Sequence, residues 1–169
     1  MNTITQSDCP FTWSVDIDDD AWSALGDIDG IVSQAIDAAM QAIPSSGEPN
    51  RQGDVSILLT DDATIARLNA DHRGKSGPTN VLSFPAHESA QDWLGDIAIA
   101  HGVVMREADE RSIAPRDHLI HLLIHGFLHL HGYDHIDDED AERMEAIERR
   151  ALARLDIADP YAVGGRMND

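Results

Sequence analysis

Hydrophobic residues recur along this chain with two different spacings, and the order of those spacings predicts the fold. Alternation of apolar and polar side chains is typical of strands, whereas apolar residues three or four positions apart are typical of helices. The expected strands lie at residues 11–17, 55–60, 81–84 and 94–100. The expected helices lie at residues 22–43, 61–72, 101–110, 118–131 and 138–155. The order β-α-β-α-β-β-α-α-α predicts an α/β or α+β single domain, with a mixed sheet of about four strands covered by about five helices.

Cap and turn residues set the expected helix boundaries. Residues 18–20 are aspartates that suit the start of the first helix, and Asp137 suits the start of the last. Ser112 or Asp117 is expected to cap the fourth helix, and Gly132 to end it, because glycine adopts the left-handed conformation that reverses the chain. The tail from about residue 156 is expected to be poorly ordered.

The fourth helix carries histidines whose spacing suits a metal ion. His125 and His129 are four residues apart, so their rings lie on one helix face one turn apart. The turn at Gly132 brings His135 back toward the same point. The pattern H-x3-H-x5-H therefore predicts a metal site. Three imidazoles leave one open position on a tetrahedral ion, which is typical of catalytic zinc, although imidazole also binds nickel, copper and iron.

The same histidines allow a structural interpretation. Together with His118 and His121 they form a stripe on a helix that is otherwise almost entirely apolar, so they could be packed core side chains with polar partners. At a rise of about 1.5 Å per residue, His121 lies roughly 16 Å from Gly132 along the helix, and His129 lies about 4.5 Å from it. Under the metal hypothesis we therefore expect His121 to orient a ligand rather than to bind the ion.

The residue after His125 limits the classes of reaction that a metal at this site would catalyse. Zinc peptidases with the pattern H-E-x-x-H place a glutamate there as general base, and this chain has Gly126. A metal at this site would still polarise a phosphoryl or carbonyl oxygen and lower the pKa of a bound water. Phosphoryl transfer also needs a cation near the developing charge, and the arginine fork suits that task.

The formal charge of −19 is unevenly distributed. Residues 1–50 contain no Lys or Arg, and most of the basic side chains lie in residues 51–116. Net negative charge repels nucleic acid at long range, so a polyanionic substrate would need a local basic patch helped by the metal. The candidates for that patch are Arg51, Arg67, Arg73, Lys75, Arg106, Arg111 and Arg116. Scattered solvated side chains explain the same distribution equally well.

Cysteine content and hydropathy indicate the cellular compartment in which we expect this protein. The one cysteine, Cys9, excludes an internal disulfide, and its thiol is expected to be buried or incidental. The first residues lack the features of a signal peptide, and no apolar run approaches the length of a membrane span. We expect a cytoplasmic protein without membrane contact whose residues 1–169 form a single domain.

Several separated segments resemble the YbeY endoribonuclease family, the bacterial rRNA maturation factors. Residues 125–135 read HGFLHLHGYDH, which is similar to the histidine signature of that family. Residues 68–75, 78–85 and 94–97 read LNADHRGK, PTNVLSFP and LGDI, and these are similar to its other characteristic segments in order and spacing. The resemblance spans about residues 50–155, and agreement at separated places argues against coincidence.

The resemblance implies a metal-dependent endoribonuclease that prefers single strands and acts in small-subunit rRNA maturation and ribosome quality control. It implies one Zn²⁺ ion bound by His125, His129 and His135, and Arg73 as the catalytic arginine that grips the scissile phosphate. Asp134 lies within the histidine segment and is expected beside the ligands, where it supports the site or caps the turn. The implied partners are single-stranded RNA, rRNA in particular, and the ribosome or ribosome-associated proteins.

Alternatives remain open from the residues alone. Arg73 could be a surface side chain paired with Asp71. The metal could serve a zinc hydrolase of another class, such as a peptidase or amidase, or a non-catalytic ribosome assembly factor whose zinc is structural. The sequence names neither the general base nor the attacking oxygen, which is either a metal-bound water or the 2′-hydroxyl of the RNA.

Overall fold

A mixed sheet organises the chain, which is described by a computed structural model over residues 2–4, 12–44, 53–87, 89–90 and 92–162. Within these ranges the strands are β1 (Asn2–Ile4), β2 (Trp13–Ile17), β3 (Asp54–Thr60), β4 (Val81–Pro85) and β5 (Trp93–Ala100). The helices are the short 3-10 helix η1 (Asp20–Leu25), α1 (Ile28–Ala42), α2 (Asp62–Arg73), α3 (His101–Glu110), α4 (Pro115–Leu130) and α5 (Asp138–Ala153).

The strand order is β1-β2-β3-β5-β4. Strands β2, β3 and β5 run parallel, and β1 and β4 pair antiparallel at the two edges. The expected α/β domain with a mixed sheet is confirmed, and its four expected strands correspond to β2, β3, β4 and β5. The additional edge strand β1 was not predicted, because three residues are too short to show a period.

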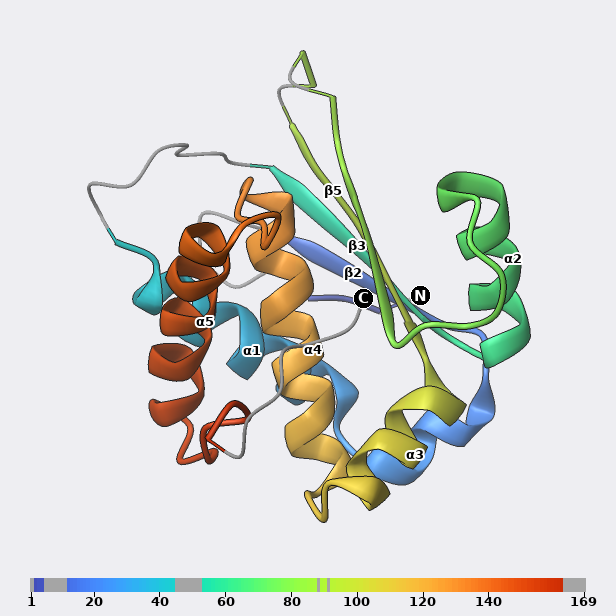
Figure 1. Cartoon of the computed structure of the whole chain (residues 1–169). Coiled ribbons are helices and arrows are strands. Elements are labelled where there is room, and N and C mark those ends of the chain that lie inside the picture. The colour runs from blue at the N-terminus through green and yellow to red at the C-terminus, as the bar shows by residue number, and fades with distance from the viewer. Residues whose placement is uncertain (1, 5–11, 45–52, 88, 91, 163–169) are drawn as a thin grey trace.

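The two faces of the sheet carry different helices (Figure 1). Ile97 and Ile99 of β5 belong to the main core, which α1, α4 and α5 complete. Ala98 and Ala100 face the other way and form a smaller core with Ile65 of α2. Both faces of β5 are therefore covered, which is usual for strands that pair in parallel. Helix α4 is the inner helix of the larger layer, because it contacts β4 and β5 as well as α1, α3 and α5.

The structure corrects the prediction of the first helix and the predicted cap of the fourth. The first expected helix is two elements, because Gly26 adopts φ 86° between η1 and α1. Neither Ser112 nor Asp117 caps α4, which begins at Pro115 without a side-chain cap. Proline at this position has no N–H to satisfy and its φ suits a first helical turn, so a capping side chain is less needed.

Other boundaries follow the sequence. Gly132 adopts φ 92° directly after the last turn of α4, as expected. Asp137 caps α5, and its carboxylate accepts the backbone N–H of Asp140 at 2.8 Å. Residues 156–162 are described, and Tyr161 packs near α4 and α5. The remaining tail, and also Cys9 and Arg51, lie outside the described residues. No helix in the described ranges is both long enough and apolar enough to cross a bilayer.

Candidate metal centre

Helix α4 and the turn after it bring three imidazoles together. The nitrogens that His125, His129 and His135 can offer to an ion all lie within 4.8 Å of one another. His125 is 2% exposed, and the other two rings are half-buried. The reversal at Gly132 places His135 beside the helix it follows, with its ring centroid 5.2 Å from that of His129. The structure thus brings together the three residues that the sequence selects as ligands.

Hydrogen bonds at the outer nitrogens orient two of these rings. His125 Nδ1 lies 2.6 Å from a carboxylate oxygen of Glu148, and His129 Nδ1 lies 2.9 Å from the backbone carbonyl oxygen of Tyr133. A carboxylate and a carbonyl only accept, so in the neutral rings both Nδ1 atoms carry the hydrogen and both Nε2 atoms carry the lone pair.

The two Nε2 atoms lie 3.1 Å apart. Two lone pairs at that separation repel unless a cation or a proton lies between them. Two nitrogens about 2.0–2.1 Å from one tetrahedral zinc ion would lie roughly 3.3 Å apart. The arrangement of His125 and His129 therefore fits a transition-metal site.

Glu148 of α5 is the charged partner of this cluster. Its side chain is fully buried, and it contacts His125, His121 at 3.6 Å, and the hydroxyl of Tyr161. Burial would raise the pKa of Glu148, but hydrogen bonds from His121 and His125 outweigh that effect and hold the pKa below its usual value. The carboxylate is therefore ionised, which suits it to orient a histidine ligand.

Two neighbours of Glu148 complete the polar cluster. His121 lies 3.4 Å from the Tyr161 hydroxyl through the same ring nitrogen that faces Glu148. Burial, followed by the charge of Glu148, raises the pKa of Tyr161, so its hydroxyl stays protonated and donates to the carboxylate. His121 thus contacts the carboxylate that faces His125, and its expected role in orienting a ligand stays a prediction. Sequence reasoning missed Glu148 and Tyr161.

A signal for Glu148 was present in the sequence. It lies beside Met144, Ile147 and Ala151 on the buried face of α5, where an acid is costly unless it is paired. A carboxylate on an otherwise apolar helix face indicates a buried polar partner. The sequence contained no comparable signal for Tyr161.

Arg73 ends α2 and lines an open cavity that two of the three histidines also line. The cavity of about 580 Å³ is lined by Arg73 together with Ser83, His129 and His135. Arg73 is exposed, so its guanidinium is accessible to a ligand in that cavity. Ser83 Oγ lies 3.4 Å from the carbonyl oxygen of Gly126 and donates to it, which gives this hydroxyl a structural partner.

Asp134 and Gly126 shape the site. The exposed carboxylate of Asp134 accepts the backbone N–H of His135 at 2.8 Å, so it supports the turn that presents this histidine. A Cβ added at Gly126 would lie 3.1 Å from both Ile97 Cγ2 and Ser83 Oγ. Helix α4 is therefore pressed against the sheet at the position where a zinc peptidase carries its glutamate.

His118 fits the other interpretation of the histidine stripe, that of a packed core side chain with a polar partner. His118 Nε2 lies 2.7 Å from a carboxylate oxygen of Glu107, and the amide of Asn80 donates to the same carboxylate at 3.2 Å. Burial would raise the pKa of Glu107, but hydrogen bonds from His118 and Asn80 lower it below its usual value. This cluster links α3, α4 and the residue before β4, and it does not include the three candidate ligands.

The fold and the histidine cluster together define a candidate metalloenzyme with an open cavity beside its imidazoles. A family model described as Endoribonuclease YbeY matches residues 18–156. The Endoribonuclease YbeY of Maricaulis maris is 58% identical over 145 residues, which cover 86% of this chain and 88% of the relative. That of Bradyrhizobium diazoefficiens is 46% identical over 151 residues, which cover 85% and 81%.

A solved structure agrees with the fold. The solution structure of TM1509 from Thermotoga maritima matches with a TM-score of 0.53 and 24% identity, over 91% of this chain and 99% of that one. With the family model and the relatives, the resemblance first found in the histidine segment is confirmed. The chain belongs to the YbeY endoribonuclease family.

Proposed function

We propose that this chain is a metal-dependent endoribonuclease that prefers single-stranded RNA and acts in small-subunit rRNA maturation and ribosome quality control. Membership of the endoribonuclease family supports the reaction. The observation that carries the metal dependence is the pair of Nε2 atoms 3.1 Å apart, each on a ring whose Nδ1 faces an acceptor. Ribosome association and a cytoplasmic location are part of the same proposal.

His125, His129 and His135 would hold one Zn²⁺ ion, because three imidazoles that leave an open position are a ligand set typical of catalytic zinc. Zinc bound there supplies a Lewis acid that neutralises charge on the phosphoryl group. Glu148 and the Tyr133 carbonyl fix the orientation of the two helix ligands through their Nδ1 hydrogens.

Arg73 is the residue that we propose as catalytic. Its guanidinium borders the cavity that His129 and His135 also line, so a phosphate near the histidines lies within the cavity that Arg73 faces. Two parallel N–H groups of arginine match two phosphate oxygens, and the match strengthens as charge develops there in the transition state. The close approach of Gly126 to the sheet disfavours the peptidase alternative, because a glutamate side chain at that position would crowd Ile97 and Ser83.

The test is cleavage of an end-labelled single-stranded oligoribonucleotide by wild type, with and without a chelator, and by His125→Ala and Arg73→Ala. We expect chelation and His125→Ala to abolish cleavage, and Arg73→Ala to slow it by roughly 100-fold or more, as loss of one electrostatic stabiliser does. Arg154→Ala is the control, because Arg154 is an exposed arginine that bonds Gln41 and belongs neither to the candidate basic patch nor to the lining of this cavity. Wild-type rates in folded His125→Ala and Arg73→Ala would refute the proposal.

A further inference from the structure

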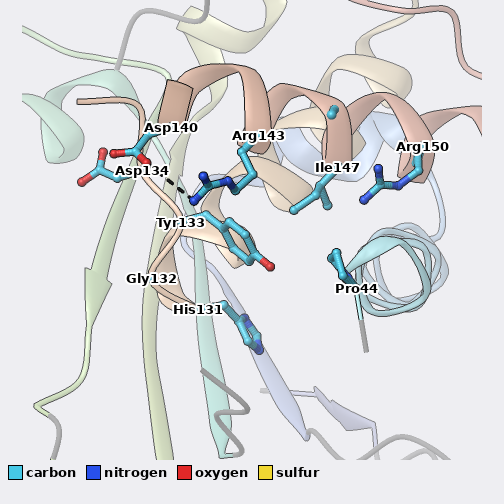
Figure 2. A pocket seen from close by; sticks show the side chains of 10 residues that line it. Pro44, His131, Gly132, Tyr133, Asp134, Asp140, Arg143, Ile147 and Arg150 are labelled. Carbon is cyan, nitrogen blue, oxygen red and sulfur yellow. Dashed lines mark ion pairs between the residues drawn. The ribbon is translucent and has the colours of Figure 1, made fainter. Parts of the chain in front are cut away.

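A second cavity adjoins the metal centre and has no part in the function proposed above. It encloses about 470 Å³ between α5, the turn after α4 and Pro44, which lies two residues after the end of α1 (Figure 2). Gly132, Tyr133 and Asp134 line this cavity and also the cavity that contains Arg73. The two cavities therefore meet at the turn that presents His135.

We propose that this second cavity binds an unpaired nucleobase of the RNA strand that crosses the metal centre. Tyr133 provides the surface on which the base stacks, and Arg143 contacts the adjoining phosphate. The inference rests on the proposed function, since it assigns a subsite for the same substrate. A volume of about 470 Å³ lies within the usual range for small-ligand sites, roughly 300–1,000 Å³.

The stacking surface belongs to the turn itself. Tyr133 is half-buried, and its ring borders the cavity on the side nearest Asp134 and Arg143, whereas Pro44 and Arg150 lie on the other side (Figure 2). An aromatic ring at an open cavity binds any base through its π-face, which suits single-stranded RNA. The carbonyl of the same residue accepts the hydrogen of His129 Nδ1, so base binding and ligand orientation share one residue.

The phosphate contact comes from Arg143. Its side chain is 60% exposed and pairs with Glu139 at 3.1 Å, a partner that is 83% exposed, and with Asp140 at 4.0 Å. Exposed ion pairs of this kind contribute little, so a phosphate that accepts two hydrogen bonds from the guanidinium displaces them readily. Arg150 donates to the carbonyl of Ala42 at 2.9 Å and is held at the far rim.

The charges of the lining favour a base over a phosphate alone. Asp134 and Asp140 balance Arg143 and Arg150, so the lining has no net formal charge in a chain whose total is −19. A neutral rim does not repel the RNA backbone. Carboxylates also accept hydrogen bonds from the exocyclic amino groups of bases, which a phosphate does not possess.

The experiment measures how a flanking sequence changes the affinity of the protein for RNA. Fluorescent 2′-O-methyl oligoribonucleotides, checked for integrity after each titration, are extended by about three nucleotides on the 5′ or the 3′ side, and their dissociation constants are measured by anisotropy with metal-loaded protein. Extension on one side should tighten binding to wild type by roughly 5- to 100-fold, the range for stacking of a base. Tyr133→Leu and Arg143→Met should each remove most of that gain. Arg154→Met is the matched control, since Arg154 follows α5 and bonds Gln41 away from the cavity.

The outcomes separate this inference from the proposed function. Equal gains in wild type, Tyr133→Leu and Arg143→Met would overturn the subsite, even if chelator-sensitive cleavage is normal. A gain that both variants lose, in a protein that cleaves no RNA, would support the subsite and refute the proposed activity. Arg143→Met changes only an exposed side chain, so it remains informative if Tyr133→Leu does not fold.

Discussion

Replacing Glu148 by glutamine removes one negative charge from the centre of the polar cluster while keeping the shape of the side chain. The hydrogen bond from His125 Nδ1 at 2.6 Å then ends on a neutral amide. The two oxygens of the carboxylate accept from His125 and from Tyr161, whereas glutamine offers one carbonyl oxygen, so one of these donors loses a good acceptor. The substitution therefore weakens the orientation of a proposed ligand without opening a cavity.

The expected loss follows from these contacts. A hydrogen bond to a charged group contributes about 1.5–3 kcal/mol, against about 1 kcal/mol for a neutral one. Loss of the group that orients a metal-binding histidine lowers metal affinity about 10- to 100-fold, which corresponds to roughly 1.4–2.7 kcal/mol. We expect Glu148→Gln to fall within that range.

The assay is competition for Zn²⁺ between the protein and a chromophoric chelator, with circular dichroism to verify folding. Glu142→Gln is the matched control, because Glu142 is an exposed residue of the same helix. It should bind Zn²⁺ as wild type does. A folded Glu148→Gln protein whose affinity stays within about twofold of wild type would refute the reasoning, since a carboxylate that orients a ligand contributes more than that.

Three further substitutions test other parts of the structure. Gly126→Ala should lower the free energy of unfolding by about 1 kcal/mol in urea titrations, because contact with Ile97 outweighs the gain in helix propensity; a more stable variant would contradict this. Glu107→Gln should cost about 1–3 kcal/mol at neutral pH in metal-free protein. The folded-state pKa of Glu107 is lowered, so its contribution is present above the unfolded value and is lost as the pH falls through the folded one; a pH-independent difference would contradict the pairing with His118. Tyr161→Phe should lower the unfolding free energy by about 1–2 kcal/mol and reduce Zn²⁺ affinity less than Glu148→Gln does, since both histidines keep the carboxylate.

Local patterns in the sequence predict most of the strands and helices of this fold. The buried strands and α4 have strong apolar patterns, so their positions followed directly from the residues. The sequence predicts one helix over residues 22–43, because the apolar residues on either side of Gly26 keep a helical spacing across it. Its positive φ depends on how η1 docks, where Trp22 donates to the carbonyl of Thr60 at 3.0 Å, and that contact spans 38 residues of sequence.

The same distinction between local and distant contacts applies to the candidate site. The approach of His125, His129 and His135 follows from helix geometry and one glycine, so the sequence alone predicts it. Glu148 reaches His125 only because α5 packs against α4, and Tyr161 reaches Glu148 through the segment after α5. Contacts of this kind depend on tertiary packing, which periodicity does not encode.

The order of synthesis gives the position of α4 and α5 a further consequence. The five strands in the described part of the chain all precede Pro115, and every proposed ligand, together with Glu148, follows it. The chain is made from its N-terminus onward, so these strands and α2 are made before the histidines, and the main core of the sheet is completed only when α4 and α5 pack on it. Because the orienting carboxylate comes from α5, the metal centre is completed only when that helix docks. The residues proposed to cut RNA are therefore made after every strand of the sheet that the structure describes.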